Sequence, residues 1–281
     1  MRIIDKKILA IDNETRVSLI EVEVPLIAEK AKAGEFAVIM ATEKGERIPL
    51  TIVDTDIKKG AVVFIFQEIG FSTKLLGSMN KGDELYSVLG PLGHPTCVKK
   101  YGRVITIAGG VGIAEIFPVA RDMKQDNHVT AILGARTKSL VILKDEIEKI
   151  ADEFFIATDD GSLGIKGFNT VILDKLLKEN KYDLVYAVGP IPMMKQVFLI
   201  TKKYNVDTIV SLNALMVDAT GMCGSCRVTV GGKIKFSCVD GPEFDARLVD
   251  WENLEKRNKI YEEKEKHICR LLSKENNRDS A

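Results

Sequence analysis

The feature that most constrains the fold is a change of hydrophobic pattern near Tyr101 of the 281-residue chain. Before this point, short runs rich in Val, Ile and Phe alternate with glycine-containing turns; the runs are Arg16–Pro25, Phe36–Met40, Leu50–Asp54 and Ala61–Glu68, with one helical run at Ser72–Met79. Several short strands at this spacing are typical of a barrel or sandwich. We therefore predict a β-barrel domain over residues 1–100.

The chain after Tyr101 alternates between apolar strands and helical runs. The expected strands are Val104–Ile107, Val129–Leu133, Phe154–Thr158 and Leu184–Val188. Such alternation predicts a parallel α/β sheet covered on both faces. We assign this domain to residues 101–206. The remaining residues, 207–281, comprise a strand and turn at Asp207–Leu215, a cysteine cluster, and a charged helix from Trp251 to Arg278.

The composition argues against two classes of partner. Forty basic residues balance forty acidic ones, so no net charge draws the chain to nucleic acid or to an anionic membrane. No stretch approaches the roughly 18 consecutive apolar residues that span a bilayer. The N-terminal sequence MRIIDKKILA also lacks the apolar core and cleavage site of a signal peptide. We expect a cytoplasmic protein that binds neither nucleic acid nor membrane.

A glycine-rich turn, Gly109-Gly110-Val111-Gly112, lies between an expected strand and an expected helix. Such a turn lets backbone N–H groups approach a pyrophosphate at a helix N-terminus. Arg136 and Gly189-Pro190 follow two further strands, so one nucleotide crevice at the carboxyl ends of the strands is expected. The alternative for the glycines is a tight turn without a ligand, and the alternative for Asp160 is an ordinary turn former.

Three of the five cysteines are clustered in the pattern D-x4-C-x2-C-x11-C, formed by Asp218, Cys223, Cys226 and Cys238. With Cys in place of Asp218, this spacing is that of a plant-type [2Fe–2S] site. We predict such a cluster with Asp218 as an oxygen ligand. Two alternatives stay open: a structural zinc site, and Asp218 as a loop-capping residue with the fourth ligand elsewhere. Cys97 and Cys269 are expected to be ordinary thiols.

The order of barrel, nucleotide-binding domain and [2Fe–2S] segment resembles the ferredoxin-reductase superfamily. Within it, the chain is similar to electron-transfer subunits of class B dihydroorotate dehydrogenase and to small (alpha) subunits of NADH-dependent reduced ferredoxin:NADP+ oxidoreductase. The latter are also called sulfide dehydrogenase beta subunits. The C-terminal sequence GMCGSCRVTVGGKIKFSCVDGPEFDA, with Asp in the first ligand position, favours the oxidoreductase subunits.

The resemblance assigns FAD to three stretches of the barrel domain. In the first, it implies that Arg47 meets the FAD diphosphate and that Pro49, Leu50 and Thr51 face the isoalloxazine ring. The other two are Gly70-Phe71-Ser72-Thr73 and Gly90-Pro91-Leu92-Gly93. For the second stretch a helix N-cap is the alternative, and for the third a simple turn.

The resemblance also assigns NAD(H) to the α/β domain. The segments GGVGIA, LGAR, TDDGS and AVGPIPMM imply that the dinucleotide is lined by Gly109, Gly110, Val111, Gly112, Arg136, Asp160, Gly189 and Pro190. The family often has Pro where this chain has Glu115, and we assign Glu115 no role.

The implied activity is electron transfer between NAD(H), FAD and a [2Fe–2S] cluster, without a catalytic acid or base. By resemblance, the partner is a larger flavoprotein subunit with [4Fe–4S] clusters. The heterodimer would couple NADPH oxidation to reduction of NAD+ and ferredoxin by flavin-based electron bifurcation. The alternatives are a dihydroorotate dehydrogenase subunit, a non-catalytic subunit with a structural zinc, and a stand-alone flavin reductase.

Overall fold

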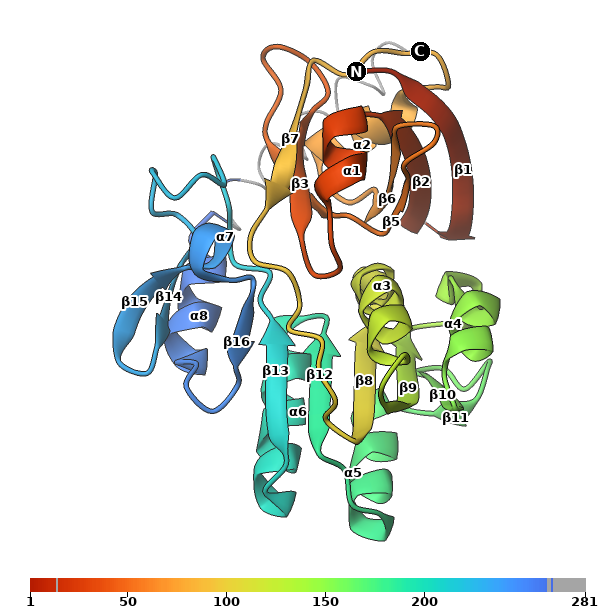
Figure 1. The fold of residues 1–281 in the computed structure, drawn as a ribbon, viewed down its shortest axis with the longest axis vertical. Helices are drawn as coiled ribbons and strands as arrows, with labels where there is room; N and C mark the ends of the chain where they lie inside the picture. Colours follow the sequence, from red (N-terminus) through yellow and green to blue (C-terminus); the bar gives the residue numbers. More distant parts are fainter. Residues whose placement is uncertain (14, 262–263, 265–281) are drawn as a thin grey trace.

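The computed structural model describes residues 1–13, 15–261 and 264. Its first part is a barrel built from two antiparallel sheets (Figure 1). One sheet has the order β1-β2-β6-β5, formed by Ile3–Asp12, Thr15–Glu23, Ala61–Gln67 and Asp54–Asp56. The other has the order β4-β3-β7, formed by Ile48–Thr51, Phe36–Met40 and Ser87–Leu92. Two short helices, α1 (Pro25–Lys30) and α2 (Phe71–Ser78), complete this part.

The second part is a seven-stranded sheet with the order β11-β10-β9-β8-β12-β13-β16. Its strands, in chain order, are β8 (Arg103–Gly109), β9 (His128–Ala135), β10 (Glu153–Thr158), β11 (Ile165–Lys166), β12 (Leu184–Val188), β13 (Asp207–Ser211) and β16 (Glu243–Asp245). All neighbours are parallel except β13 and β16. Because the strand order reverses between β8 and β12, the carboxyl ends of these two strands form a topological switch point.

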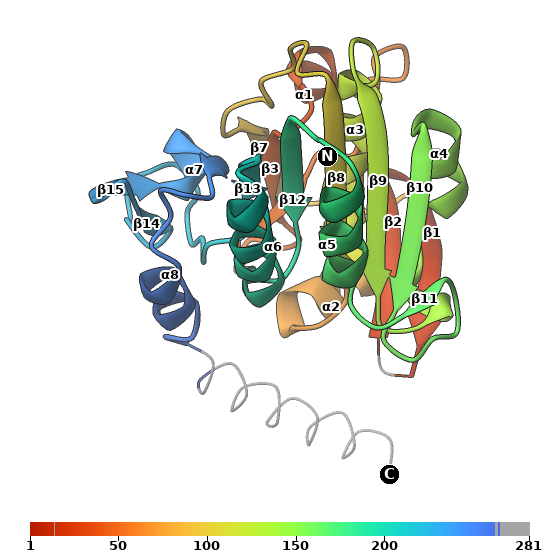
Figure 2. The same ribbon diagram turned by 90° about the horizontal axis from the view of Figure 1, so that it is seen from below.

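Four helices cover the two faces of this sheet (Figure 2). Helices α3 (Ile113–Met123) and α4 (Lys144–Ile150) contribute to the core on one face, and α5 (Asn169–Glu179) and α6 (Ile191–Tyr204) to the core on the other. The face with α3 also packs against the barrel, since Ala10, Val17 and Val53 belong to the same apolar cluster as α3. This shared core fixes the barrel above the carboxyl edge of the sheet.

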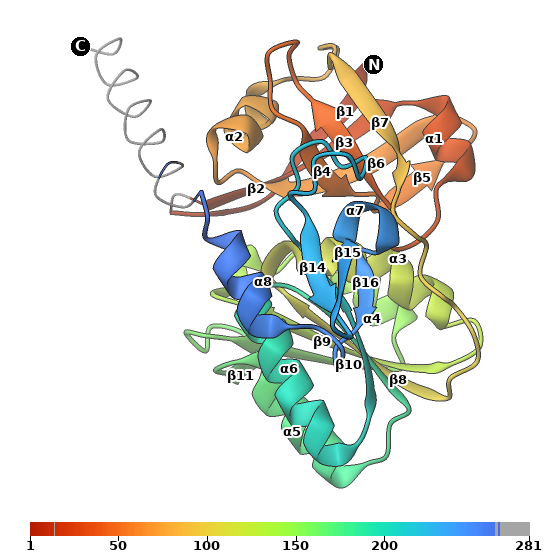
Figure 3. The same ribbon diagram turned by 90° about the vertical axis from the view of Figure 1, so that its left-hand side faces the viewer.

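The C-terminal segment lies against both other parts (Figure 3). It comprises the hairpin β14 (Arg227–Val230) and β15 (Lys233–Phe236), helix α7 (Ser237–Asp240), and helix α8 (Trp251–Asn258). The indole of Trp251 stacks on the ring of Phe198 in α6, and Lys195 pairs with Glu255 at 3.1 Å. Strand β16 joins the edge of the seven-stranded sheet, so the segment is integrated into the α/β domain.

The predicted fold class is confirmed: a barrel, then a mostly parallel α/β sheet, then a C-terminal segment. Sequence patterns missed β1, α1 and β7, because Lys and Asp interrupt the apolar run of β1 and Gly90-Pro91 breaks that of β7. Gly90-Pro91-Leu92 is therefore strand rather than a simple turn; β7 pairs only with β3, where an edge strand tolerates proline.

Two further predictions extend past the described part of the chain. Helix α8 ends at Asn258, and the rest of the predicted charged helix, with Cys269, lies outside the described residues. The domain boundaries after residues 100 and 206 stay predictions. Among the described helices, none is long and apolar enough to cross a membrane.

Candidate functional site

A crevice of about 740 Å³ lies between the barrel and the carboxyl edge of the seven-stranded sheet. Its barrel wall comes from β2, β6 and Ile69. Its other wall comes from the turns after β8, β9 and β12 and from the starts of α5 and α6. The predicted residues that line it are Gly109, Gly110, Val111, Arg136 and Pro190. The volume suits a small-molecule cofactor, and the position is the switch point where α/β sheets bind nucleotides.

Glycine is required at this turn by close packing and by backbone conformation. A Cβ on Gly109 would lie 2.6 Å from the Met193 sulfur and 2.9 Å from Cδ of Pro190. Gly110 has a φ of +58°, a conformation that side chains disfavour. Gly112 does not line the crevice; its Cβ would meet the Val188 carbonyl at 2.8 Å, so it serves helix-to-strand packing. The turn thus leaves backbone N–H groups open at the start of α3.

The other predicted nucleotide residues behave differently from one another. Gly189 has a φ of +154° and packs against Gly109, so it supports the glycine turn without lining the crevice itself. Asp160 accepts hydrogen bonds from the backbone N–H and hydroxyl of Ser162, which lower its pKa, and its neighbour Asp159 lines the crevice instead. Arg136 donates to the Thr15 hydroxyl at 2.7 Å and so joins the crevice wall to the barrel. Asp160 therefore shapes the turn after β10, and its contact with a dinucleotide stays a prediction.

The predicted flavin residues of β4 and β7 share one sheet. Both strands pair with β3, and Phe36 lies opposite Thr51 on one side and Leu92 on the other. Pro49 is exposed, and Leu50 and Thr51 are half-buried, so the β4 strip is partly open to solvent. Arg47 is exposed at the start of this strip. A guanidinium, a hydroxyl and an open strip fit the diphosphate and ring of a flavin.

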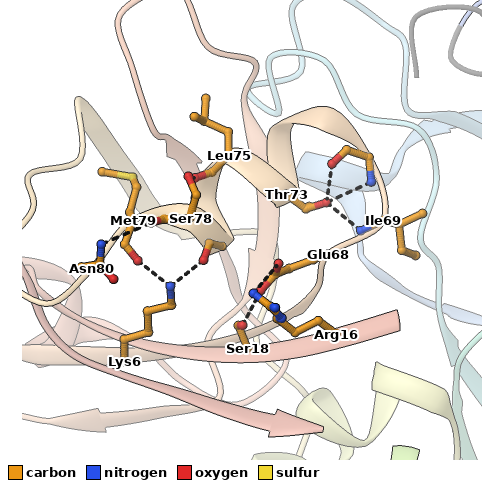
Figure 4. Close-up of polar contacts among 12 residues, drawn as sticks. Lys6, Arg16, Ser18, Glu68, Ile69, Thr73, Leu75, Ser78, Met79 and Asn80 are labelled. Atoms are coloured by element: carbon orange, nitrogen blue, oxygen red, sulfur yellow. Dashed lines mark hydrogen bonds and ion pairs between the residues drawn. The ribbon is translucent and has the colours of Figure 1, made fainter. Parts of the chain in front are cut away.

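The flavin stretch Gly70-Phe71-Ser72-Thr73 begins helix α2 (Figure 4). The Thr73 hydroxyl accepts from the backbone N–H groups of Ile69 and Gly70, at 3.0 and 3.1 Å, and so caps the helix. Ser72 donates to the Glu46 carboxylate. At the other end, the Lys6 ammonium donates to the carbonyls of Gly77 and Met79, which complements the helix dipole.

A second polar group fixes α2 to the barrel from below. Ser18 donates to Glu68 at 2.6 Å, Arg16 lies 3.8 Å from the same carboxylate, and a Cβ on Gly77 would collide with it (Figure 4). Helix α2 is thus held by side chains at both ends and along its buried face. The hydrogen bonds of the Thr73 hydroxyl with the Ile69 and Gly70 N–H groups are those of a helix cap; a flavin contact of Thr73 stays a prediction.

Strand β7 connects the flavin strip to the C-terminal segment. Gly93, just after β7, packs so closely on Gly241-Pro242 that a Cβ would lie 2.9 Å from Cδ of Pro242. The His94 backbone N–H donates to the Gly241 carbonyl at 2.7 Å. The Cys-rich segment therefore touches the barrel at the end of the strand that carries Pro91 and Leu92.

The predicted cluster ligands lie in two pairs. Cys226 and Cys238 are buried, with their sulfurs 3.2 Å apart. Cys223 is exposed, and its backbone N–H donates to Asp218 at 3.0 Å. Asp218 also accepts from the Thr220 N–H at 2.8 Å, and this bond leads the causes that lower its pKa. Burial raises the pKa of the Cys238 thiol to about 12, whereas the Ser225 N–H lowers that of Cys223.

The donor set fits a two-iron group better than a single ion. Within the described residues, no three His, Cys, Asp or Glu side chains gather as a one-metal group. A tetrahedral structural zinc needs four ligands around one point, whereas a [2Fe–2S] cluster places two ligands on each iron. A buried thiol pair beside a separate carboxylate–thiol pair suits the second arrangement. Asp218 caps the loop in this structure, and each carboxylate oxygen keeps a further lone pair.

One residue that sequence patterns gave no role occupies a central position. Glu115, in the first turn of α3, accepts from the Thr51 hydroxyl at 3.3 Å and from the Tyr186 hydroxyl at 3.4 Å. Burial raises the pKa of this half-buried carboxyl to about 7. The only signal in the sequence was a carboxylate inside an otherwise apolar helical run, IAEIFPVA.

Comparison with family models identifies two regions of the chain. Residues 106–198 match the oxidoreductase NAD-binding domain, which contains the turn at Gly109 and the crevice strands. Residues 213–250 match the iron–sulfur cluster binding domain of dihydroorotate dehydrogenase B, which contains all four predicted ligands. The chain is therefore an oxidoreductase with NAD-binding and iron–sulfur binding domains.

Similar proteins cover nearly the whole chain. The electron transfer subunit homolog of dihydroorotate dehydrogenase B (NAD(+)) from Thermotoga maritima is 48% identical over 243 residues, 86% of each chain. The corresponding electron transfer subunit of Desulforamulus reducens is 31% identical over 89% of this chain and 99% of its own.

A solved chain of the NADH-dependent reduced ferredoxin-NADP oxidoreductase, described for flavin-based electron bifurcation, superposes with a TM-score of 0.89. It is 44% identical, and the match covers 96% of this chain and 97% of that one. The resemblance inferred from the sequence is confirmed by these matches. With the barrel, the nucleotide crevice and the paired cluster ligands, they show that this chain belongs to the family of dihydroorotate dehydrogenase B-type electron transfer subunits.

Proposed function

We propose that this chain is the small subunit of an electron-bifurcating NAD(H)/NADPH/ferredoxin oxidoreductase. In this role it moves electrons between NAD(H), FAD and a [2Fe–2S] cluster and exchanges them with a larger flavoprotein subunit. The observation that carries the proposal is the contact of Gly93 and His94, just after β7, with Gly241-Pro242, because it brings the end of the flavin strip next to the segment that carries Cys238.

The crevice residues bind and orient the nicotinamide nucleotide. The N–H groups of Gly110 and Val111 would receive the pyrophosphate at the start of α3, and Arg136 would border the adenosine end. On the barrel, Arg47 would pair with the FAD diphosphate, and Pro49 to Thr51, Gly70 to Thr73 and Gly90 to Gly93 would contact the flavin. Bound FAD accepts a hydride and releases electrons singly, which lets it serve a one-electron cluster.

The loop residues hold the cluster. Cys226 and Cys238 supply the two thiolates of the buried pair, and Cys223 and Asp218 supply the exposed pair. An oxygen donor in place of a thiolate changes the reduction potential, because ligand identity is one of the levers that set it. The exposed pair faces outward, with Met222 beside it 89% exposed, where a partner subunit can approach.

The partner is a larger flavoprotein subunit with [4Fe–4S] clusters, through which electrons reach ferredoxin. Support comes from the solved oxidoreductase chain at 44% identity and from Asp in the first ligand position. We place the complex in the cytoplasm, in keeping with clustered unpaired thiols.

A dihydroorotate dehydrogenase subunit is the second candidate, favoured by the 48% identical relative and by the family model. The two candidates share every cofactor and differ in the partner. The test is to co-purify the chain with its native partner and measure NADPH-dependent reduction of NAD+ with ferredoxin as the second acceptor. The proposal predicts that activity; dihydroorotate oxidation coupled to NAD+ reduction, without it, would establish the second candidate instead.

A further inference from the structure

A chain of hydrogen-bonded side chains crosses the molecule where its three parts meet. It starts at Thr51 of the barrel, continues through Glu115 of α3 and Tyr186 of β12, and reaches Glu243 of β16. The Tyr186 hydroxyl lies 2.6 Å from Glu243 and 3.4 Å from Glu115, so it bridges the two carboxyls. The chain ends at Thr96, which donates to Glu243.

The two ends of this row of hydrogen-bonded side chains lie in different surroundings. Thr51 belongs to the partly open β4 strip, whereas Thr96 lines a second cavity, of about 410 Å³, between the barrel and α3. That cavity also carries the charged side chains of Lys32, Asp54 and Arg121, which mark it as a hydrated groove. The middle of the hydrogen-bonded row is enclosed, since Tyr186 is fully buried.

The hydroxyls of Thr51, Tyr186 and Thr96 both donate and accept hydrogen bonds. Glu115 and Glu243 do so as well when each carboxyl is protonated. The Tyr186 hydroxyl has one proton and donates it to the nearer carboxyl, Glu243; its contact with Glu115 is then complete only when Glu115 is the donor. Burial favours the protonated form of both carboxyls, and Glu243 disfavours a second charge on Glu115. The other titratable group that senses Glu243 is Tyr101.

We propose that Thr51, Glu115, Tyr186, Glu243 and Thr96 form a proton path between the flavin face of β4 and the groove beside α3. This inference rests on the proposed function in one respect, namely that the β4 strip faces FAD. Glu115 is the proton-holding residue of the path, and Tyr186 and Glu243 relay the proton onward.

The need for such a path follows from the chemistry of the two cofactors. When a flavin that carries a transferred hydride at N5 is oxidised by a one-electron cluster, two electrons and one proton leave it. The electrons would pass one at a time through the cluster to the partner subunit, and neither acceptor takes up the proton from the broken N5–H bond. It bonds to the Thr51 oxygen while the Thr51 proton passes to the Glu115 carboxylate. Proton positions then shift along Tyr186 and Glu243, and one proton leaves from Thr96 to water in the groove.

The test uses the full-length chain loaded with FAD and cluster, with Glu115→Gln and Tyr186→Phe as variants. Glu179→Gln, an exposed change at the end of α5, is the matched control. Infrared difference spectra between oxidised and NADH-reduced protein, recorded in H2O and D2O, report carboxyl protonation directly. We expect a carboxylic-acid band that shifts in D2O, that Glu115→Gln abolishes and that Glu179→Gln keeps.

A second measurement follows proton release to an indicator dye during flavin reoxidation. Tyr186→Phe keeps the ring but removes the relaying hydroxyl, and we expect release to slow by about 100-fold while hydride transfer from NADH is unchanged. A carboxyl band that persists in Glu115→Gln, or unchanged release in both variants, would overturn the path. Failure of the wild-type chain to hold FAD would contradict the proposed function instead, so the two failures are distinguishable.

Discussion

The nucleotide crevice and the cluster loop are held in place by different means. The crevice is formed by backbone: three turns at the ends of parallel strands, with Gly109 and Gly189 in contact, on a sheet whose central strands β8, β9 and β12 are almost entirely buried. The cluster loop shares positive φ angles with the crevice turn, at +62° for Ala219 and +84° and +68° for Gly221 and Gly224, but it is held by hydrogen bonds to the Asp218 side chain. The crevice exists because of the fold, whereas the loop depends on local bonds such as those of Asp218.

This difference predicts how each site responds to damage. A change in the crevice meets a packed sheet that cannot yield, so its effect falls on nucleotide affinity. A change in the loop removes a ligand or a local hydrogen bond, so its effect falls on cluster retention and on the properties of the cluster. Four predictions, from the largest expected effect to the smallest, test this contrast.

The largest effect is expected for Cys226→Ser. Cys226 is buried and its sulfur lies 3.2 Å from that of Cys238, so its loss removes one thiolate of the buried pair. We expect iron per chain to fall from about two to near zero, with FAD retained. Cys97→Ser is the matched control, because Cys97 is an exposed thiol outside the cluster pattern. Full iron content in the Cys226 variant would contradict the ligand assignment.

The next effect is expected for Gly109→Ala. The added Cβ would lie 2.9 Å from the Pro190 ring, which begins α6 and cannot move without that helix. We expect the Kd for NAD(H), measured by calorimetry, to rise by about 10- to 100-fold, which corresponds to about 1.4 to 2.8 kcal/mol. Gly231→Ala, at a hairpin glycine with a φ of +57° and open space for a Cβ, strains only the β14–β15 turn and should leave this Kd unchanged. Equal affinity in both variants would show that the glycine turn does not face the nucleotide.

A smaller effect concerns the pH dependence of stability at Glu115. Its pKa is raised from 4.5 to about 7 in the folded chain, so the folded state binds the proton more tightly than the unfolded state. Stability is therefore lost as pH rises between these two values, by at most about 3 kcal/mol and by less because solvent screens a half-buried group.

Glu115→Gln should reduce the decrease in stability with rising pH, so the difference in unfolding midpoint between pH 5 and pH 8 should shrink. Urea unfolding of wild type, Glu115→Gln and Glu179→Gln at both pH values provides the measurement. The same pH dependence in all three proteins would contradict the raised pKa.

The smallest effect on occupancy is expected for Asp218→Cys. The exposed pair with Cys223 has room for a thiolate, so iron should be retained while the visible and EPR spectra shift toward those of a four-cysteine cluster. Asp218→Ala removes both loop-capping hydrogen bonds, and it should lower iron retention on dilution with chelator. An Asp218→Cys spectrum identical to wild type would mean that the fourth ligand lies elsewhere.

Much of the fold was predictable because periodicity reports burial. The strands Phe36–Met40 and Leu184–Val188 were predicted with their observed bounds, since each is a continuous apolar run. Strand β1 was not, because Asp5, Lys6 and Lys7 interrupt the apolar run of IIDKKILAID at the edge of a sheet. The nucleotide-binding turn was predictable because the glycines that allow close backbone packing also form a recognisable sequence pattern.

The buried polar contacts were not predictable from pattern. Glu115 and Glu243 are 128 positions apart in the chain, and Tyr186 joins them only because β12 lies inside the sheet, between β8 and β13. Asp160 shows the opposite case: its motif suggested a ligand contact, and its hydrogen bonds to Ser162 make a turn. Residue type and spacing indicate which groups are available; tertiary packing decides which of them meet.

The central claim is that one chain conducts electrons from a nicotinamide nucleotide through flavin to a [2Fe–2S] cluster. The most direct test is an anaerobic titration of the purified, cofactor-replete chain with NADH, followed by visible absorption and EPR, with iron and zinc counted on the same sample. The account predicts about two irons per chain, bleaching of the flavin bands, and an EPR signal of a reduced [2Fe–2S] cluster that grows with added NADH. One zinc per chain with no flavin, or flavin reduction that never reaches the iron, would contradict it.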